Sequence, residues 1–322
     1  MPNLNVAVLG SLDYAKEIGK KSTSSDITYY DLKKGSDSVS LMEPTRYPDK
    51  ISSLFYCVSN CRFAILVVDK VDNLLGENVL MLDCLGIKQG WIVLRNFIQP
   101  EQLKPFLAGT SVESFQFRED DSNALREELL SIAASLDVHE PAKEAPSCGS
   151  VPIDHHFNVK GVGTVVLGSV MDGFIRKHEK LRVFPLKEII TLRSIQKHDD
   201  DWTTAVEGDR VGLALKGIES DRLDRGYVLS NDPKMKTTLE AELSVELIRF
   251  WPTPLKEGMV LHVGHWMQMV PCRILQVSGS DWHKPSLKVL FDTEVVHRPD
   301  DLAVLIYLEG GKLRIVGTAR LP

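Results

Sequence analysis

The chain lacks the segments that would place it in or across a membrane. Its 322 residues contain no run of 18 apolar residues, and the first residues show no basic stretch followed by an apolar core. A spanning helix and a secretory signal need these features, so we expect neither, and no membrane partner. The five cysteines are odd in number and without disulfide spacing, which favours a cytoplasmic location.

An excess of positive charge is also missing. The net charge is −6: residues 1–140 carry 14 Lys and Arg against 20 Asp and Glu, and residues 141–322 carry 24 of each. A nucleic-acid-binding domain usually shows a basic face. We therefore expect no DNA partner, and any RNA contact must come from a local patch such as residues 176–182.

Metal-ligand clusters and nucleophile–base pairs are not found either. Cys57 and Cys61 are four residues apart on a predicted helix, but two further ligands are missing, so we predict buried thiols. His155 and His156 begin a strand, where neighbouring side chains point to opposite faces. We predict no catalytic residue and no metal site.

The first part of the chain alternates strand and helix patterns. Apolar strands are predicted at 4–9, 63–68, 91–94 and 114–117, with helices at 48–59, 78–85, 100–107 and 122–136. This alternation predicts a doubly wound parallel α/β domain over residues 1–138. Residues 139–150, rich in Pro, Ala, Glu and Ser, are a predicted linker.

In the rest of the chain, turn-forming residues are spaced as in small β-barrels. Turn signals recur about every 8–12 residues, as in a closed barrel, and Gly161 and Gly163 interrupt a β-branched segment as a barrel corner requires. Residues 239–247 alternate in polarity, and Gly310-Gly311 separates two apolar strands. We predict one barrel over residues 151–234 and another over 235–322.

Four segments in the first predicted barrel follow one another in an informative order. They read GVGTVVLGSVMDG from Gly161, RSIQKH from Arg193, AVEGDRVGLALKGI from Ala205 and DRGYVL from Asp224. This order resembles the middle barrel of translational GTPases of the elongation factor Tu group. The RSIQKH run resembles archaeal and selenocysteine-specific (SelB-like) members, and residues 303–317 resemble the closing strands of their third domain. The resemblance implies a P-loop-NTPase-like GTPase domain followed by two β-barrels.

The phosphate-binding motif of such a GTPase domain is not intact. It requires G-x-x-x-x-G-K-[ST], so that backbone N–H groups surround the phosphates and a hydroxyl meets Mg²⁺. From Gly10 the chain has Ala15 in place of the second Gly and Glu17 after Lys16. The interpretation is that the loop and part of its helix are lost, leaving Gly10, Lys16 and Thr28 as remnants of the nucleotide site.

The two other nucleotide motifs also fail. Near the expected Asp-x-x-Gly, Glu43 stands in for the Asp and no Gly follows in the third place. After the strand 91–94 the chain has Arg95-Asn96-Phe97-Ile98 where Asn-Lys-x-Asp would read guanine. We therefore expect no GTP hydrolysis and no cofactor, with GTP and Mg²⁺ relevant only if the loop is divergent but working.

The resemblance also implies a site for the aminoacylated end of tRNA on the first barrel. By analogy Arg193, Ile195, Gln196 and Arg210 line it, and the two guanidinium groups suit a phosphate or a carbonyl. Elongation factor Tu has Glu and Asn in place of the two arginines, so the implied pocket is not the standard one.

Three functional hypotheses follow. The first is a SelB-like elongation factor homologue that binds tRNA or the ribosome and has lost its GTP-binding motifs. The second is an active, divergent GTP-binding factor that delivers a specialised aminoacyl-tRNA. The third is a protein-interaction scaffold that retains only the fold, with a protein partner.

Overall fold

The computed structural model describes residues 3–35, 37–136, 141–142 and 147–322. Residues 139–140 and 143–146 of the predicted linker lie outside the described residues. Contacts divide the chain into two units, residues 1–137 with 306–317 and residues 138–305 with 318–322. In the described part, no helix is long and apolar enough to cross a membrane.

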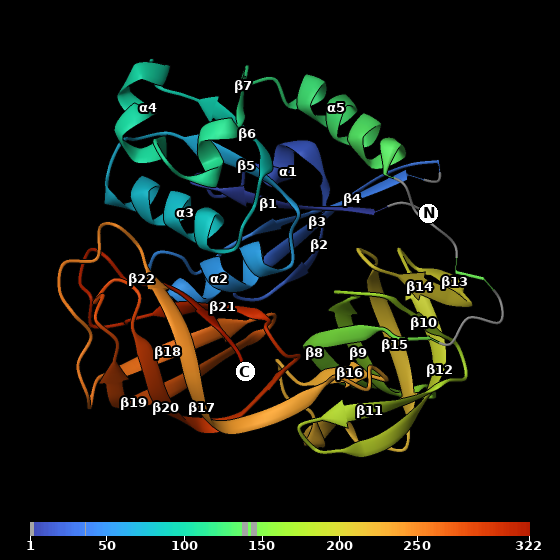
Figure 1. Ribbon diagram of the computed structural model, residues 1–322. Helices are drawn as coiled ribbons and strands as arrows, with labels where there is room; N and C mark the ends of the chain where they lie inside the picture. Colours follow the sequence, from blue (N-terminus) through green and yellow to red (C-terminus); the bar gives the residue numbers. More distant parts are fainter. Residues whose placement is uncertain (1–2, 36, 137–140, 143–146) are drawn as a thin grey trace. The chain divides into compact units, whose positions relative to one another are not determined.

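The first unit is built on a seven-stranded sheet with the order β2-β3-β4-β1-β5-β6-β7 (Figure 1). Strands β4, β1, β5, β6 and β7 are parallel, whereas β2 and β3 are antiparallel to their neighbours. The strands are β1 (Asn3–Leu9), β2 (Lys20–Ser24), β3 (Thr28–Lys34), β4 (Asp37–Glu43), β5 (Phe63–Val68), β6 (Gln89–Leu94) and β7 (Gln116–Arg118). Every residue of β1 and β5 is buried, as expected for a parallel sheet with both faces covered.

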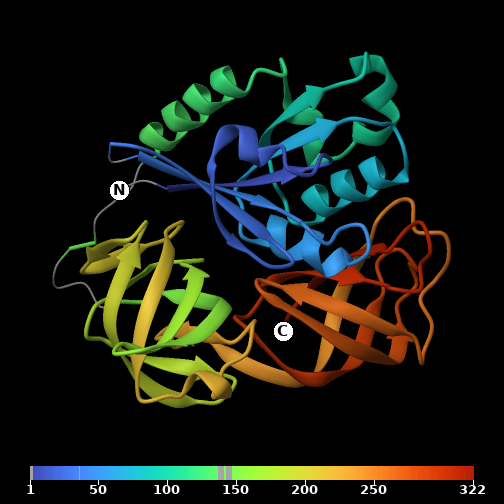
Figure 2. The same cartoon turned by 180° about the vertical axis from the view of Figure 1, so that it is seen from behind.

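Helices cover both faces of this sheet. They are α1 (Ala15–Ile18), α2 (Ile51–Ser59), α3 (Asn73–Cys84), α4 (Pro100–Leu107) and α5 (Ser122–Ser135), with a 3₁₀ turn at Ser111–Ser114. Apolar residues of α1 and α5 form one core with the sheet, and Figure 2 shows α2, α3 and α4 on the other face. Asp121 accepts hydrogen bonds from the N–H groups of Asn123 and Ala124 and so caps the N-terminus of α5.

The segment 306–317 completes the first unit through one arginine. The Arg314 guanidinium donates to both carboxylate oxygens of Glu77 in α3, at 2.9 and 2.5 Å, and to the carbonyl oxygen of Pro48 at 2.9 Å. The Glu77 side chain is 3% exposed. A buried carboxylate needs such a partner, so residues 306–317 are part of how this unit is stabilised.

The second unit contains a barrel made of antiparallel strands. Its strands are β8 (Ser150–Val159), β9 (Gly163–Ser169), β11 (Lys180–Phe184), β12 (Glu188–Lys197), β13 (Asp200–Trp202), β15 (Arg210–Lys216) and β16 (Val228–Ser230), with a small ribbon of β10 (Phe174–Arg176) and β14 (Thr204–Val206). The order is β11-β16-β8-β9-β15-β12-β13, and pairing of β11 with β12 closes it. Inward residues such as Val166, Ile195 and Leu213 form its apolar core.

A further closed barrel has the order β17-β20-β19-β18-β21-β22. Its strands are β17 (Lys236–Leu247), β18 (Val260–His265), β19 (Gln268–Ser278), β20 (Ser286–His297), β21 (Leu302–Ile306) and β22 (Ile315–Arg320). Gly311 in the predicted hairpin between β21 and β22 has a φ of +65°, the conformation for which glycine is suited.

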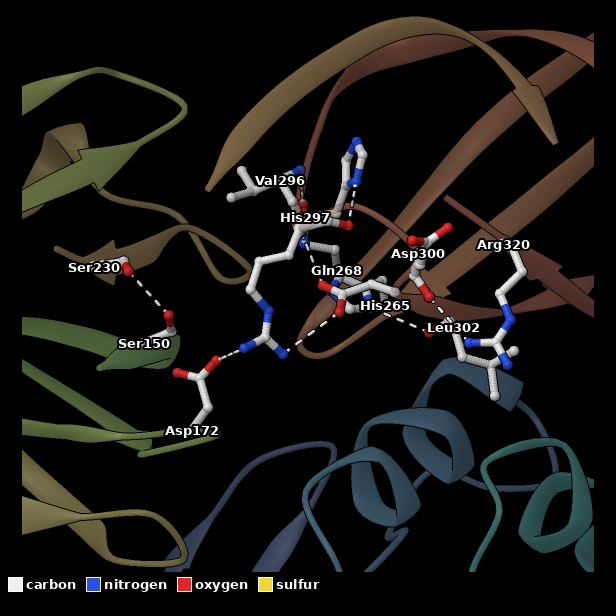
Figure 3. A network of polar contacts seen from close by, with 12 residues as sticks. Ser150, Asp172, Ser230, His265, Gln268, Val296, His297, Asp300, Leu302 and Arg320 are labelled. Carbon is white, nitrogen blue, oxygen red and sulfur yellow. Dashed lines mark hydrogen bonds and ion pairs between the residues drawn. The ribbon is translucent and has the colours of Figure 1, made fainter. Parts of the chain in front are cut away.

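Within the second unit, a polar network links the two barrels. Arg298 pairs with Asp172 of the first of them and lies near Asp301, and Asp301 is 3.2 Å from the Nε2 atom of His265. Figure 3 shows this network, with Asp172 near one end and His265 in the ribbon of the other barrel. Burial favours a higher pKa for Asp301, but His265 and Arg298 lower it to about 2.

The described elements confirm the predicted fold class. An α/β domain of the P-loop-NTPase type is followed by two β-barrels. The predicted helix at 78–85 begins earlier, at Asn73, because the Asp72 carboxylate caps the N–H groups of Leu74 and Leu75.

Candidate functional site

Two regions carry the residues that the sequence singled out. The first is the carboxyl edge of the α/β sheet, which we define by the connections that follow β1, β5, β6 and β7. Because these strands are parallel, their carboxyl ends meet at one edge, where ligands bind in open α/β folds. The second is the outer surface of the barrel that contains β12 and β15.

Gly10 follows β1 directly, at the carboxyl edge. Its φ is +91°, and a Cβ atom there would lie 2.0 Å from the carbonyl oxygen of Val67. Only glycine fits both constraints without a backbone shift. The residue is therefore accounted for by the close approach of β1 and β5.

The helix that follows is a single turn, α1, and its N-terminal end is already occupied by a side chain. The Glu43 carboxylate, from the end of β4, accepts from the N–H of Ala15 at 2.6 Å and from the N–H of Asp13 at 3.1 Å. The Tyr30 hydroxyl donates to the same carboxylate at 3.2 Å. Backbone N–H groups at this place in a phosphate-binding loop point at a phosphate, whereas here they bind a carboxylate of the chain itself.

Glu43 is almost fully buried, with 2% of its surface exposed. Burial raises the pKa of its carboxyl, and the hydrogen bonds from Ala15, Tyr30 and Asp13 oppose that rise. These contacts show why an acidic residue stands at the end of β4. The sequence pointed to Glu43 only as a substitute for a motif aspartate, and nothing local in it predicted the contact with α1.

Lys16 and Thr28 have different surroundings. Lys16 is exposed on α1. Thr28 is buried at the start of β3, where its hydroxyl is 2.6 Å from the Thr45 hydroxyl and 3.0 Å from that of Ser24. The three hydroxyl groups satisfy one another, so Thr28 joins the segment before β3 to the segment after β4.

The place expected to read guanine holds an ion-pair network. Arg95 is 3.0 Å from Asp120 and 3.6 Å from Asp69, and its guanidinium lies 5.9 Å from the centre of the Tyr14 ring. The Tyr14 hydroxyl donates to Asp120 at 2.8 Å. The polar side chains in this part of the edge are therefore paired with one another.

The four residues implied for tRNA binding are placed in three different environments. Ile195 is fully buried in the barrel core, so its side chain packs and does not reach the surface. Arg193 is exposed at a bulge in β12 and donates to the carbonyl oxygen of Val162 at 3.0 Å. Gln196 is exposed and donates to Asp201 at 3.2 Å.

Arg210 is engaged in a structural ion pair. It donates to Asp154 at 2.5 Å, and the Asp154 side chain is 2% exposed. Burial favours a higher pKa for Asp154, but Arg210 and His155 outweigh it and lower the pKa to about 2. Only Arg193 and Gln196 of the four therefore present exposed polar groups.

The strand register identifies a further residue beside Gln196. Gly212 of β15 pairs with Gln196 on one side and with Leu167 of β9 on the other. A Cβ atom at Gly212 would lie 3.6 Å from Leu167 and 3.9 Å from Gln196, so glycine leaves bare backbone between an apolar and an amide side chain. Since the neighbouring Val166, Leu213 and Ile195 point inward, Leu167, Gly212 and Gln196 form a strip that faces outward from the barrel.

Comparisons with known proteins agree with this organisation. Residues 163–230 match the family described as elongation factor Tu domain 2. The uncharacterized protein MJ0325 of Methanocaldococcus jannaschii is 37% identical over 323 residues, covering 100% of both chains. The selenocysteine-specific elongation factor of the same organism is 28% identical over 84% of this chain, which spans 61% of that factor.

Solved structures share the fold. The crystal structure of translation elongation factor SelB from Methanococcus maripaludis, in complex with the GTP analogue GppNHp, has a TM-score of 0.80 at 20% identity. The match covers 100% of this chain and 79% of that one. A bacterial selenocysteine-specific elongation factor also has a TM-score of 0.80, at 19% identity, and the match covers 58% of that chain.

Proposed function

Because the chain belongs to the elongation factor Tu and SelB-like family of translational GTPases, we propose that it binds tRNA or the ribosome without a guanine nucleotide. The observation that carries this proposal is the contact of Glu43 with the N–H groups of Asp13 and Ala15. A carboxylate of the chain holds the donors that a phosphate would need, and a nucleotide would have to displace it. A protein with this function works in the cytoplasm, beside the translation machinery.

The changed motif residues support the same conclusion. Glu17 places a carboxylate where a hydroxyl would meet Mg²⁺, and Arg95 is paired with Asp69 and Asp120 where guanine would be read. On this proposal, phosphate and guanine recognition are weakened by separate residues, in the connections after β1 and after β6. A single compensating change would not restore both.

Calorimetric titration of nucleotide-stripped protein with GTP and with GDP, in excess Mg²⁺, tests the nucleotide part of the proposal. We expect no heat of binding at micromolar protein. Micromolar or tighter binding would instead establish the divergent GTPase, and a loss of that binding in Lys16→Ala would assign it to α1.

For the RNA part, we propose that the strip around Gly212, with Arg193 and Gln196, takes the acceptor end of tRNA. Hydrogen bonds to a charged group contribute about 1.5–3 kcal/mol, so Arg193→Ala should weaken binding about 10- to 100-fold. Arg222→Ala is the matched control, since it removes the same charge from an exposed place between β15 and β16 of the same barrel, outside residues 176–182. A gel shift with tRNA at low salt measures both, and equal affinities for the two variants would remove the strip from the proposal.

A further inference from the structure

One side chain at the carboxyl edge is exposed in a way that the fold does not require. Phe97 follows β6 and is 98% exposed. It lies in a four-residue turn in which the N–H of Ile98 donates to the carbonyl oxygen of Arg95 at 3.1 Å. An isolated aromatic ring that packs on nothing adds no stability to the folded state.

The backbone at this turn makes the choice of phenylalanine costly. Asn96 and Phe97 have φ values of +53° and +60°, so both central residues are left-handed, as in a type I′ turn. Asn is suited to the first of these places and Gly to the second, whereas a bulky residue there is strained. A glycine would serve the turn better, which indicates that the ring at residue 97 has another use.

Hydrogen bonds on both sides of the turn hold the backbone of Phe97 in place. The Asn96 side-chain amide donates to the carbonyl oxygen of Asp69 at 3.0 Å, and the N–H of Arg95 donates to that of Val68 at 3.1 Å. On the other side, Gln99 donates to the carbonyl oxygen of Phe97 at 3.2 Å. Because the backbone is already ordered, only the side-chain torsions of Phe97 lose freedom on binding, which lowers the entropic cost for an interface anchor.

The surroundings of the ring define the chemistry of its partner. Residues 10–17, 69–72, 95–99 and 118–121, which form this edge, carry seven carboxylates and four cationic side chains, a local charge of −3. Phosphates are repelled by such an edge, which disfavours base stacking on nucleic acid. Basic side chains on a protein surface are attracted to it.

We propose that Phe97 anchors a protein–protein interface and inserts into an apolar pocket bordered by Lys or Arg side chains on a partner protein of the translation machinery. The location of the partner rests on the proposed function, whereas the kind of surface rests on the ring and the charge around it. Aromatic anchors of this kind contribute a large share of binding energy. Phe97→Gly should therefore weaken the interaction about 10- to 100-fold while leaving the melting temperature unchanged or raised.

Photo-cross-linking of the full chain to purified ribosomes tests the proposal. Benzoylphenylalanine is introduced at position 97 or, as a matched control, at Phe250, which is 48% exposed. We expect a cross-link from position 97 alone, to a basic protein, that weakens when the exposed Glu119 is changed to Lys.

Cross-links to RNA alone, or none at all, would overturn the proposal. Co-sedimentation with ribosomes and the tRNA gel shift, scored on the same samples, decide separately whether the proposed function holds. A marked fall in the melting temperature of Phe97→Gly would also overturn it, because it would give the ring a structural role.

Discussion

Glu43→Gln is the most direct perturbation of the occupied carboxyl edge. The wild-type carboxylate accepts from two backbone N–H groups, those of Ala15 and Asp13, and from the Tyr30 hydroxyl. Glutamine has nearly the same shape but only one oxygen. Whichever way the amide turns, one of the two backbone N–H groups faces an NH₂ group and loses its acceptor.

The size of the effect follows from those contacts. An unsatisfied buried donor costs about 1–3 kcal/mol, and the loss of charge weakens the remaining hydrogen bonds further. We expect the free energy of unfolding to fall by about 2–4 kcal/mol. With a urea slope of about 2–3 kcal/mol per molar, the unfolding midpoint should fall by about 1 M.

Urea unfolding followed by circular dichroism measures this change. Glu17→Gln is the matched control, because Glu17 is an exposed glutamate on α1, the same helical turn, and its removal should change stability by less than about 0.5 kcal/mol. Equal midpoints for the two variants would refute the assignment of Glu43 as the group that satisfies α1. Binding of GTP by Glu43→Gln, absent in the wild type, would show that the carboxylate excludes the nucleotide.

Three further predictions address other contacts. The folded-state pKa of Asp154 is about 2, below the ordinary value of about 3.9. Its ionised carboxylate therefore stabilises the fold fully above about pH 3.9, and this stabilisation is lost as the pH falls toward 2. The free energy of unfolding, measured as a function of pH, should fall by about 2 kcal/mol in this window, and Asp154→Asn should remove that fall. A double-mutant cycle of Glu77→Gln and Arg314→Gln should give a coupling energy of about 2 kcal/mol by chemical denaturation, and a value near zero would contradict a stabilising role for this pair. Gly10→Ala should destabilise by more than about 2 kcal/mol in thermal melts, since its Cβ would meet backbone at 2.0 Å, and an unchanged melting temperature would contradict that close approach.

Local sequence patterns predicted the elements that have a strong periodicity of their own. Helices α4 and α5 were predicted to within one residue, because Pro100 and Asp121 mark their first turns. The glycine-punctuated strands of the barrels were predicted from turn spacing. Strands β2 to β4 were not predicted as a group, since the short polar strand Lys20–Ser24 owes its conformation to pairing with β3.

The candidate sites were less predictable, because they depend on contacts between distant residues. The sequence indicated that the phosphate loop was broken, but Glu43 meets Ala15 only once β4 lies beside β1. Likewise, Arg210 was predicted to face a ligand. In the structure its guanidinium instead donates to the carboxylate of Asp154, which is 56 residues away in sequence. A single sequence shows which charged groups exist, and the fold decides which of them are already paired.

The pairing of Arg314 with Glu77 has a consequence for the order in which the protein is made. The first unit combines residues 1–137 with residues 306–317, and about 170 residues must be synthesised between these two segments. At about 5–20 residues per second, those residues take roughly 10–30 s to be added. During that interval the nascent α/β domain must hold the Glu77 carboxylate without its guanidinium, and the domain reaches its final stability only when the end of the chain has left the ribosome.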